Sequence, residues 1–258
     1  MYATNYFETA FLNTMKNITF AAPSQIFVGL YITNPTDEGT GVEISYTGYE
    51  RQQITFSNAA EEEGQIQIKN LEQIRFPETA TDAGTVTHIG ISDSKIGGNM
   101  LAYGRLIEDL EVRKGEAPIL LAGEVIMYST GQLSKSYKKK MLNVLRGESI
   151  TGFIPHVALF NGDPDNGGSE LLGENYARVE VEFTAPTQNT SGQSVISNNT
   201  EIRFNRPSTD WGMWNYTAIM DNLTQGEPIW IHNRGLTKEL KRGYMPLAEV
   251  GALKFALN

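Results

Sequence analysis

Apolar residues recur at helical spacing near the beginning of the chain and again about halfway along it. The first stripe contains Phe7, Phe11, Leu12 and Met15, and the second contains Tyr137, Met141, Leu142 and Leu145. Both sets follow the spacing i, i+4, i+5, i+8, which places their side chains on one face of a helix. Ser134 is a suitable N-cap for the second helix, and Gly147 is suited to its C-terminal end. The pattern therefore predicts two short amphipathic helices.

After each helix, the pattern changes to short apolar or alternating runs separated by turn residues. In the first half these runs are Ile26–Ile32, Glu50–Phe56, Gln65–Ile68, Gln73–Phe76, Val86–Ser92, Met100–Arg105 and Ile119–Tyr128. In the second half they are Pro155–Phe160, Arg178–Phe183, Ser194–Ser197, Glu201–Phe204, Asn215–Met220, Pro228–His232 and Leu247–Leu257. Short runs of this kind with Gly, Pro and Asn turns are typical of β-sandwiches and barrels. We expect a mainly β protein, with two tandem β-sandwich-like domains, each preceded by a short helix.

The two halves are copies of one unit. Residues 72–126 match residues 200–254 at a constant offset of 128 residues without a gap, and the match continues upstream with small drifts. The shared positions are mostly turn glycines, prolines and apolar strand residues, so the duplication preserves a scaffold. A unit of this length is a whole domain. We expect a first domain at residues 1–132 and a second at 133–258. The linker between them is so short that we expect the two domains to pack in a fixed arrangement.

Two acidic residues recur in the same turn motif. Asp82 and Asp210 both lie in Thr-Asp-X-Gly, where Asp typically accepts hydrogen bonds from nearby backbone N–H groups. A pair of carboxylates can also catalyse glycoside hydrolysis when it is suitably spaced, but we interpret these two as structural. The same interpretation applies to four repeated turn glycines, namely Gly84, Gly212, Gly98 and Gly226.

Composition and motifs exclude several kinds of chemistry. The net charge of −9 argues against a nucleic-acid partner, which would require a basic face. The chain has no cysteine, and the three histidines, His88, His156 and His232, lack the spacing of a metal site. No apolar run reaches the 18 residues of a membrane span. We therefore expect no catalytic residue, no metal, no cofactor and no membrane partner.

Three tryptophans, Trp211, Trp214 and Trp230, occur in the second copy alone. The first copy has Ala83, Val86 and Ala102 at the matching positions. Such side chains can fill a core, anchor a partner interface or stack on sugar rings. The sequence leaves these three roles open.

Four segments of the first copy are similar to a known family. They are Gly48–Gln52 (GYERQ), Ile74–Pro77 (IRFP), Ala83–Asp93 (AGTVTHIGISD) and Gly97–Gly104 (GGNMLAYG). Together they resemble a family of tailed-bacteriophage structural proteins usually labelled tail fibre or minor tail protein. The second copy keeps the frame of these motifs but not the Gly-Ile-Ser-Asp stretch. The resemblance implies a structural component of the virion, with no catalytic residues to transfer.

The hypothesis from sequence is a non-enzymatic virion protein of the tail, neck or baseplate. It would assemble with itself and with other virion proteins through its repeated β-domain surfaces. Capsid decoration or a head fibre is one alternative. A host-receptor or glycan-binding module, using the tryptophans of the second copy, is another.

Overall fold

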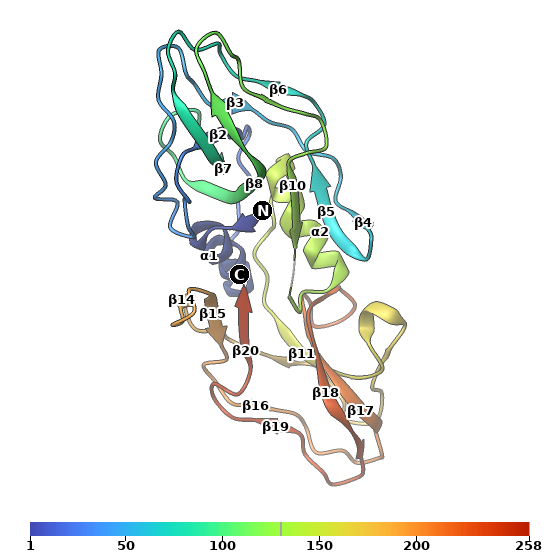
Figure 1. The fold of residues 1–258 in the computed structure, drawn as a ribbon. Helices are drawn as coiled ribbons and strands as arrows, with labels where there is room; N and C mark the ends of the chain where they lie inside the picture. The colour runs from blue at the N-terminus through green and yellow to red at the C-terminus, as the bar shows by residue number, and fades with distance from the viewer. Residues whose placement is uncertain (130, 258) are drawn as a thin grey trace.

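The computed structural model describes residues 1–129 and 131–257, and the protein is mainly β, as expected (Figure 1). The first copy contains β1 (Tyr2–Ala3), α1 (Asn5–Asn13), β2 (Phe27–Tyr31), β3 (Gln52–Gln53), β4 (Ala60–Glu62), β5 (Gln65–Lys69), β6 (Ile74–Arg75), β7 (Gly84–Ser92), β8 (Met100–Val112), β9 (Ile119–Leu120) and β10 (Ile126–Ser129). The second contains α2 (Lys135–Asn143), β11 (His156–Asn161), β12 (Ser169–Glu170), β13 (Val179–Glu180), β14 (Thr187–Gln188), β15 (Ser194–Ser197), β16 (Ile202–Arg203), β17 (Gly212–Met220), β18 (Pro228–Leu240), β19 (Leu247–Ala248) and β20 (Lys254–Leu257). Short 3-10 helices follow α1 at Thr14–Lys16, follow α2 at Val144–Arg146 and precede β12 at Pro164–Asn166.

Each copy has one larger and one smaller antiparallel sheet, with a two-stranded ribbon beside them. The main sheet of copy one has the order β1-β8-β7-β2-β3, and that of copy two contains β12-β11-β17-β18, with β13 also paired to β11. The small sheets are β10-β5-β4 and β14-β15-β20, and the ribbons are β6-β9 and β16-β19. Leu30 pairs with Ile89, and Leu159 pairs with Thr217 at the equivalent register. The central strands therefore have the same order in the two copies, β8-β7-β2-β3 and β18-β17-β11-β13, with Leu30 and Leu159 equivalent. The edge strands β1 and β12 are each matched in the other copy only by an isolated bridge.

Both helices begin at a side-chain cap that also ties them to the main sheet of their own copy. The hydroxyls of Thr4 and Ser134 accept the N–H groups of Phe7 and Tyr137, at 3.4 and 3.1 Å. The same hydroxyls donate to carbonyls at the start of β8 and β18. Ser134 is thus the N-cap of α2, and Gly147 ends the following turn at φ 87°, as the sequence predicted. A left-handed residue at this position is a common helix ending.

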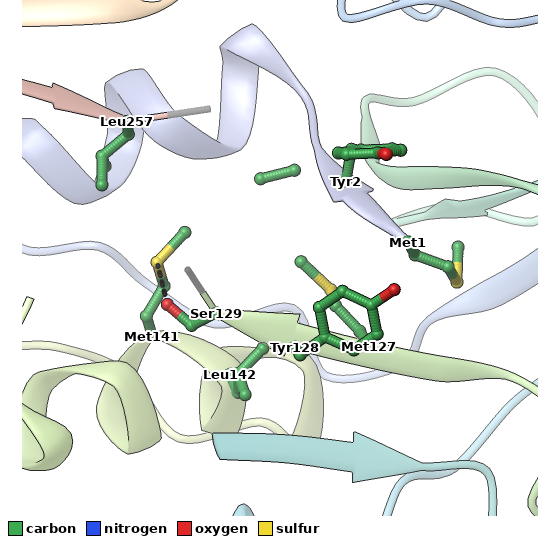
Figure 2. Close-up of a pocket in the computed structure, with 9 residues that line it drawn as sticks. Met1, Tyr2, Met127, Tyr128, Ser129, Met141, Leu142 and Leu257 are labelled. Carbon is green, nitrogen blue, oxygen red and sulfur yellow. Dashed lines mark hydrogen bonds between the residues drawn. The ribbon is translucent and has the colours of Figure 1, made fainter. Parts of the chain in front are cut away.

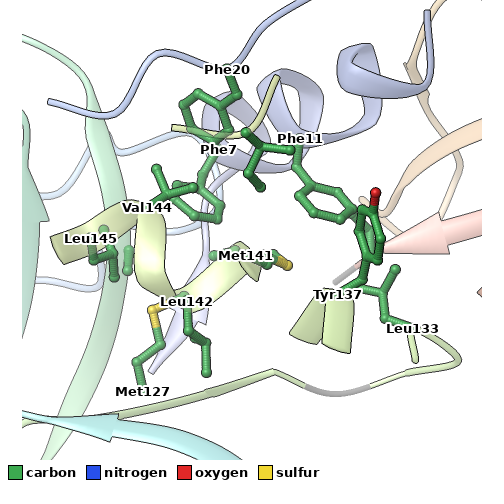
Figure 3. Packing of buried hydrophobic residues seen from close by; sticks show 14 of the residues in the cluster. Phe7, Phe11, Phe20, Met127, Leu133, Tyr137, Met141, Leu142, Val144 and Leu145 are labelled. Atoms are coloured by element: carbon green, nitrogen blue, oxygen red, sulfur yellow. The ribbon is translucent and has the colours of Figure 1, made fainter. Parts of the chain in front are cut away.

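The two copies share one hydrophobic core at the centre of the molecule. In Figure 1 both helices lie between the two main sheets, which occupy opposite ends. The helix α1 lies against β15 of copy two as well as β8, and α2 lies against β5 and β10 of copy one as well as β18. Figure 3 shows Phe7 and Phe11 of α1 in one cluster with buried residues of copy two, among them Tyr137 and Met141. Each helix therefore completes a core to which the other copy contributes.

The copies meet about an approximate twofold axis. Phe20 and Ile150 are equivalent residues, and the backbone N–H of each donates to the carbonyl of the other, at 2.9 and 3.0 Å. Beside them, Ala22 N–H donates to Ser149 Oγ, and Gly152 N–H donates to Thr19 Oγ1. A residue that pairs with its own counterpart is characteristic of an isologous, twofold interface. The chain is therefore built like a homodimer joined into one polypeptide.

Three expectations about the strands need correction. The strands β8 and β18 extend about seven to eight residues beyond the predicted ends at Arg105 and His232. Their outer halves carry charged residues because both faces reach solvent, and this obscures the apolar alternation. The predicted runs Ile119–Tyr128 and Leu247–Leu257 each divide into two strands, because Gly123 and Gly251 adopt left-handed turns at φ 81° and 75°. The strands β1, β4, β12 and β14 were not predicted.

Candidate functional site

The repeated Asp residues lie in turns at the outer ends of the main sheets. One carboxylate oxygen of Asp82 accepts the backbone N–H of Lys114 at 2.9 Å, and one of Asp210 accepts that of Arg242 at 2.7 Å. Each bond joins the turn before β7 or β17 to the turn after its partner strand. Gly84 and Gly212, two residues further on, adopt φ 106° and 99°, which favour glycine.

The glycines Gly98 and Gly226 lie in the turns that connect the two long strands of each copy. Both adopt φ 72°. A Cβ at either position would collide with the carboxylate of Asp93 or Asp221. These carboxylates accept the backbone N–H groups that follow the turn, at 2.7 and 2.8 Å. The turn geometry accounts for the glycines and the acids together.

A repeated ion pair fastens the same turn to the neighbouring loop. In copy one, the Arg51 guanidinium makes a bidentate contact with Glu43 and donates to the carbonyls of Ser94 and Gly97. Tyr49 donates its hydroxyl to Glu43 at 2.8 Å and accepts the N–H of Leu30.

Copy two repeats this arrangement with Arg178, Glu170 and Tyr176. The ion pair measures 2.7 Å, and the side chain of Arg178 is 8% exposed. Burial raises the pKa of both tyrosine hydroxyls, so they stay protonated donors. We call the group formed by Tyr49, Glu43 and Arg51, and its counterpart in copy two, the arginine clamp. It positions a turn and presents no free reactive group.

A buried asparagine is repeated as well. Asn70 and Asn198 each donate two side-chain bonds to backbone carbonyls and accept one N–H, from Val125 and Leu253 respectively. Asn198 is fully buried, and its oxygen accepts at 2.9 Å. These hydrogen bonds all join the side-chain amides to backbone groups of the same chain, which indicates a structural role.

The tryptophans of copy two occupy two different environments. Trp211 and Trp230 are buried, at 4% and 3% exposure, and their indole N–H groups donate to Glu174 O and Gln132 Oε1. Trp214 is half-buried, and its N–H donates to Thr217 Oγ1 at 3.2 Å. The guanidinium of Arg234 lies 3.6 Å from the centre of the Trp214 ring. The structure therefore places Trp214 alone of the three at a surface.

Trp214 forms part of the rim of a cleft of about 240 Å³ in copy two. The cleft lies between the inner face of the main sheet and the β16-β19 ribbon, and buried aliphatic side chains such as Val157, Leu159 and Ile202 form its walls. His232 and Arg234 of β18 lie at its opening and are exposed and half-exposed. An apolar concavity with polar groups at its opening is suited to a ligand or a partner side chain. We call this feature the copy-two cleft.

A second pocket lies where the two copies join. Figure 2 shows it between β1, β10 and α2, with Met127, Met141 and Leu257 among the side chains around it. Its volume is about 30 Å³, which is close to the space that one water molecule occupies. It belongs to the junction and offers no room for an organic ligand.

The remaining chemistry of the described residues is sparse. Within residues 1–129 and 131–257, no three His, Asp or Glu side chains are grouped so as to hold a metal ion. His88, His156 and His232 lie on three different strands, β7, β11 and β18. No helix in the described part of the chain has the length and apolar character needed to cross a membrane. The copy-two cleft is the candidate site that the geometry supports best.

The architecture is that of a tandem-repeat β protein whose two units are fused across a twofold interface. The sequence model of a family described as "Podophage GP4 fiber I protein gp80" matches residues 2–128 and again residues 132–256. The chain therefore belongs to this family, contains its unit twice, and is a component of the virion. The resemblance to a phage family labelled tail fibre or minor tail protein is confirmed. No curated protein matches the chain.

Sequence reasoning missed the arginine clamp and the buried asparagines. A signal was present for the clamp, since Tyr49 and Arg51 recur as Tyr176 and Arg178. The partner carboxylates are Glu43, at an isolated bridge to Tyr31, and Glu170, in the short strand β12, and both lie where the register between the copies drifts. No pattern along the sequence indicates the copy-two cleft, because its walls come from five strands and the loops beside them.

Proposed function

We propose that this virion protein is a non-enzymatic structural subunit of the phage tail, neck or baseplate. It assembles with itself and with neighbouring virion proteins through the surfaces of its two domains, residues 1–132 and 133–258. The observation that carries the proposal is that the polar groups present in both copies bind the backbone of the chain itself. The repeated polar groups, including both arginine clamps and Asn70 and Asn198, are bonded to the chain's own backbone. The surfaces between them differ, as expected if the copies meet different neighbours.

Cryo-electron microscopy of purified particles tests this assignment. The proposal expects the chain in several copies at the tail, neck or baseplate, with both domains in contact with protein. Density on the capsid surface would favour decoration or a head fibre instead. Absence from purified particles would contradict the structural role, and release of sugar fragments from host cell wall by the pure chain would contradict the non-enzymatic part.

A host-glycan module is the second candidate, and Trp214 is the observation that favours it. Indole rings at a cleft opening can stack on sugars. The Arg234 guanidinium already covers one face of this ring, so a sugar would need the other face or a displaced arginine. A glycan array with the chain and its Trp214→Ala variant separates the two functions, because a structural subunit gives the same weak signal for both.

A further inference from the structure

The negative charge of the chain belongs entirely to copy one. Of the 30 acidic residues, 17 lie in residues 1–132 together with eight of the 21 basic ones. Residues 133–258 contain 13 acidic and 13 basic residues, so copy two is neutral and copy one carries the whole −9. Two copies of one frame have thus acquired different electrostatic surfaces, which favours contact between unlike copies.

The same difference appears in a repeated bulge on the long outer strand. In β8, residues 106–109 protrude between the paired positions Arg105 and Leu110. In β18, residues 234–237 protrude between Asn233 and Lys238. Such insertions redirect side chains and interrupt strand pairing. We call these segments the copy-one bulge and the copy-two bulge.

The copy-one bulge presents an apolar side chain next to two acidic residues. Ile107 is 100% exposed. Glu108 and Asp109 follow it directly, and Glu111 lies two residues beyond them on the same strand. Asp109 pairs with Arg105 and Glu111 pairs with Arg113, so Glu108 is the acid of this group for which the described residues provide no ion pair. Ile107 is thus an apolar side chain that its own chain leaves uncovered, at a bulge whose next two residues are acidic. Leu106, by contrast, packs against the copy-one core.

The copy-two bulge has the opposite charge and stands beside a cavity. Arg234 replaces Leu106 at the equivalent position and lies at the opening of the copy-two cleft. Lys238 lies further along the same strand, 3.6 Å from the ring centre of Tyr244. Among residues 1–129 and 131–257, neither Arg234 nor Lys238 forms an ion pair, and the same holds for Glu108.

We propose that the copy-one bulge of one chain docks at the copy-two cleft of a second copy of this chain. Ile107 enters the apolar cleft beside Trp214, and the acids that follow it face Arg234 and Lys238. The two main sheets lie at opposite ends of the molecule in Figure 1, so one chain cannot satisfy its own cleft. The contact is heterologous, and repeated contacts of this type build a ring or an open string. This inference rests on the proposed structural function and specifies its self-contact.

Single substitutions on each side test the contact by sedimentation velocity over a range of concentrations. Ile107→Asp and Arg234→Glu should each weaken self-association at least tenfold, and added salt should weaken the wild-type assembly. Ile96→Asp is the matched control, because Ile96 is 87% exposed on copy one but lies in a different turn. It should associate like the wild type. Thermal unfolding of each variant verifies that folding is intact.

A mixing experiment establishes that the contact joins unlike surfaces. The Ile107→Asp chain has an unchanged copy-two cleft, and the Arg234→Glu chain has an unchanged copy-one bulge. In an equimolar mixture, the bulge of the second chain can dock at the cleft of the first, so the mixture should form dimers and no larger assemblies. A wild-type chain that remains monomeric at every concentration, or a mixture that remains monomeric, overturns the inference. So does undiminished assembly of either single variant. If both variants enter particles normally, the contact is wrong while the structural function stands; if wild type is absent from particles, the proposed function itself fails.

Discussion

Copy one and copy two are alike in the polar contacts that support the backbone and differ in the side chains around the copy-two cleft and in the outer halves of the long strands. The arginine clamp, the buried asparagine and the turn glycines have the same partners in both copies. At the cleft, however, Val86 and Leu106 of copy one are replaced by Trp214 and Arg234. Because the frame is held by repeated polar contacts, the surface between them could diverge without loss of the fold. A duplicated scaffold of this kind gives one chain two domains with the same frame and different surfaces.

The largest expected effect separates the tryptophans of copy two from one another. Trp211→Ala and Trp230→Ala should each lower the free energy of unfolding by about 3–5 kcal/mol, because large buried rings leave cavities. Trp214→Ala should lower it by about 1 kcal/mol or less, since this ring is half-exposed. Chemical denaturation of the three variants measures the difference. Equal losses at all three positions would contradict the placement of Trp214 at a surface.

The arginine clamps should contribute equally in the two copies. Arg51→Ala and Arg178→Ala each leave a partly buried glutamate without its partner, and each should cost about 2–4 kcal/mol, below the range for fully buried pairs. Arg203→Ala is the control, because this exposed pair with Glu201 should contribute less than about 1 kcal/mol. If one clamp proved dispensable, the clamps would not be part of the shared frame.

A pH-dependent difference is expected at the helices. Glu8 on α1 is buried, and burial raises the pKa of its carboxyl to about 7, with the nearby Asp37 acting in the same direction; the N–H of Ser194 opposes the shift at 3.3 Å. The folded state therefore holds a proton that the unfolded state releases near pH 4.5, and stability should fall as pH rises from about 4.5 to 7.

Glu8→Gln should remove this loss and raise stability at pH 8 by about 1–3 kcal/mol, with little change at pH 4. Lys138→Gln at the equivalent position of α2 should change stability by less than about 0.5 kcal/mol at either pH. Thermal unfolding at both pH values provides the measurement. A wild-type chain that is equally stable at pH 4.5 and 8, and no gain from Glu8→Gln, would show that Glu8 titrates normally.

The smallest expected effect concerns the repeated turns. Asp82→Ala and Asp210→Ala each remove one acceptor of a backbone N–H and should cost about 0.5–2 kcal/mol, as loss of a helix cap does. The two costs should agree within about 0.5 kcal/mol, because the bonds to Lys114 and Arg242 are equivalent. A turn that tolerates alanine in one copy only would mean that the frame has diverged there.

The local features of this fold could be predicted from sequence, and the features that join distant segments could not. Ser134 and Gly147 mark helix ends through bonds within one turn, so their pattern is visible along the chain. The repeat was visible because glycines such as Gly98 and Gly226 occupy left-handed turns that other residues rarely adopt. The helices that complete the other copy's core, and the pairing of Phe20 with Ile150, depend on how the two units meet.

The candidate site was accessible from sequence only in part. The three tryptophans were singled out together, yet burial separates Trp214 from Trp211 and Trp230. No periodicity distinguishes a ring that fills a core from a ring at the opening of a cleft. The outer half of β18, which carries Arg234, was missed as a strand because charged residues mask its alternation.

Cross-linking mass spectrometry of purified particles tests most directly whether the two copies meet different neighbours. Lys114 and Lys241 are both exposed and lie at the same turn of the two copies, after β8 and β18. The account predicts that these lysines cross-link to different sites, including links from Lys114 of one chain to the copy-two domain of another. Identical sets of cross-linked partners for the two lysines would contradict it.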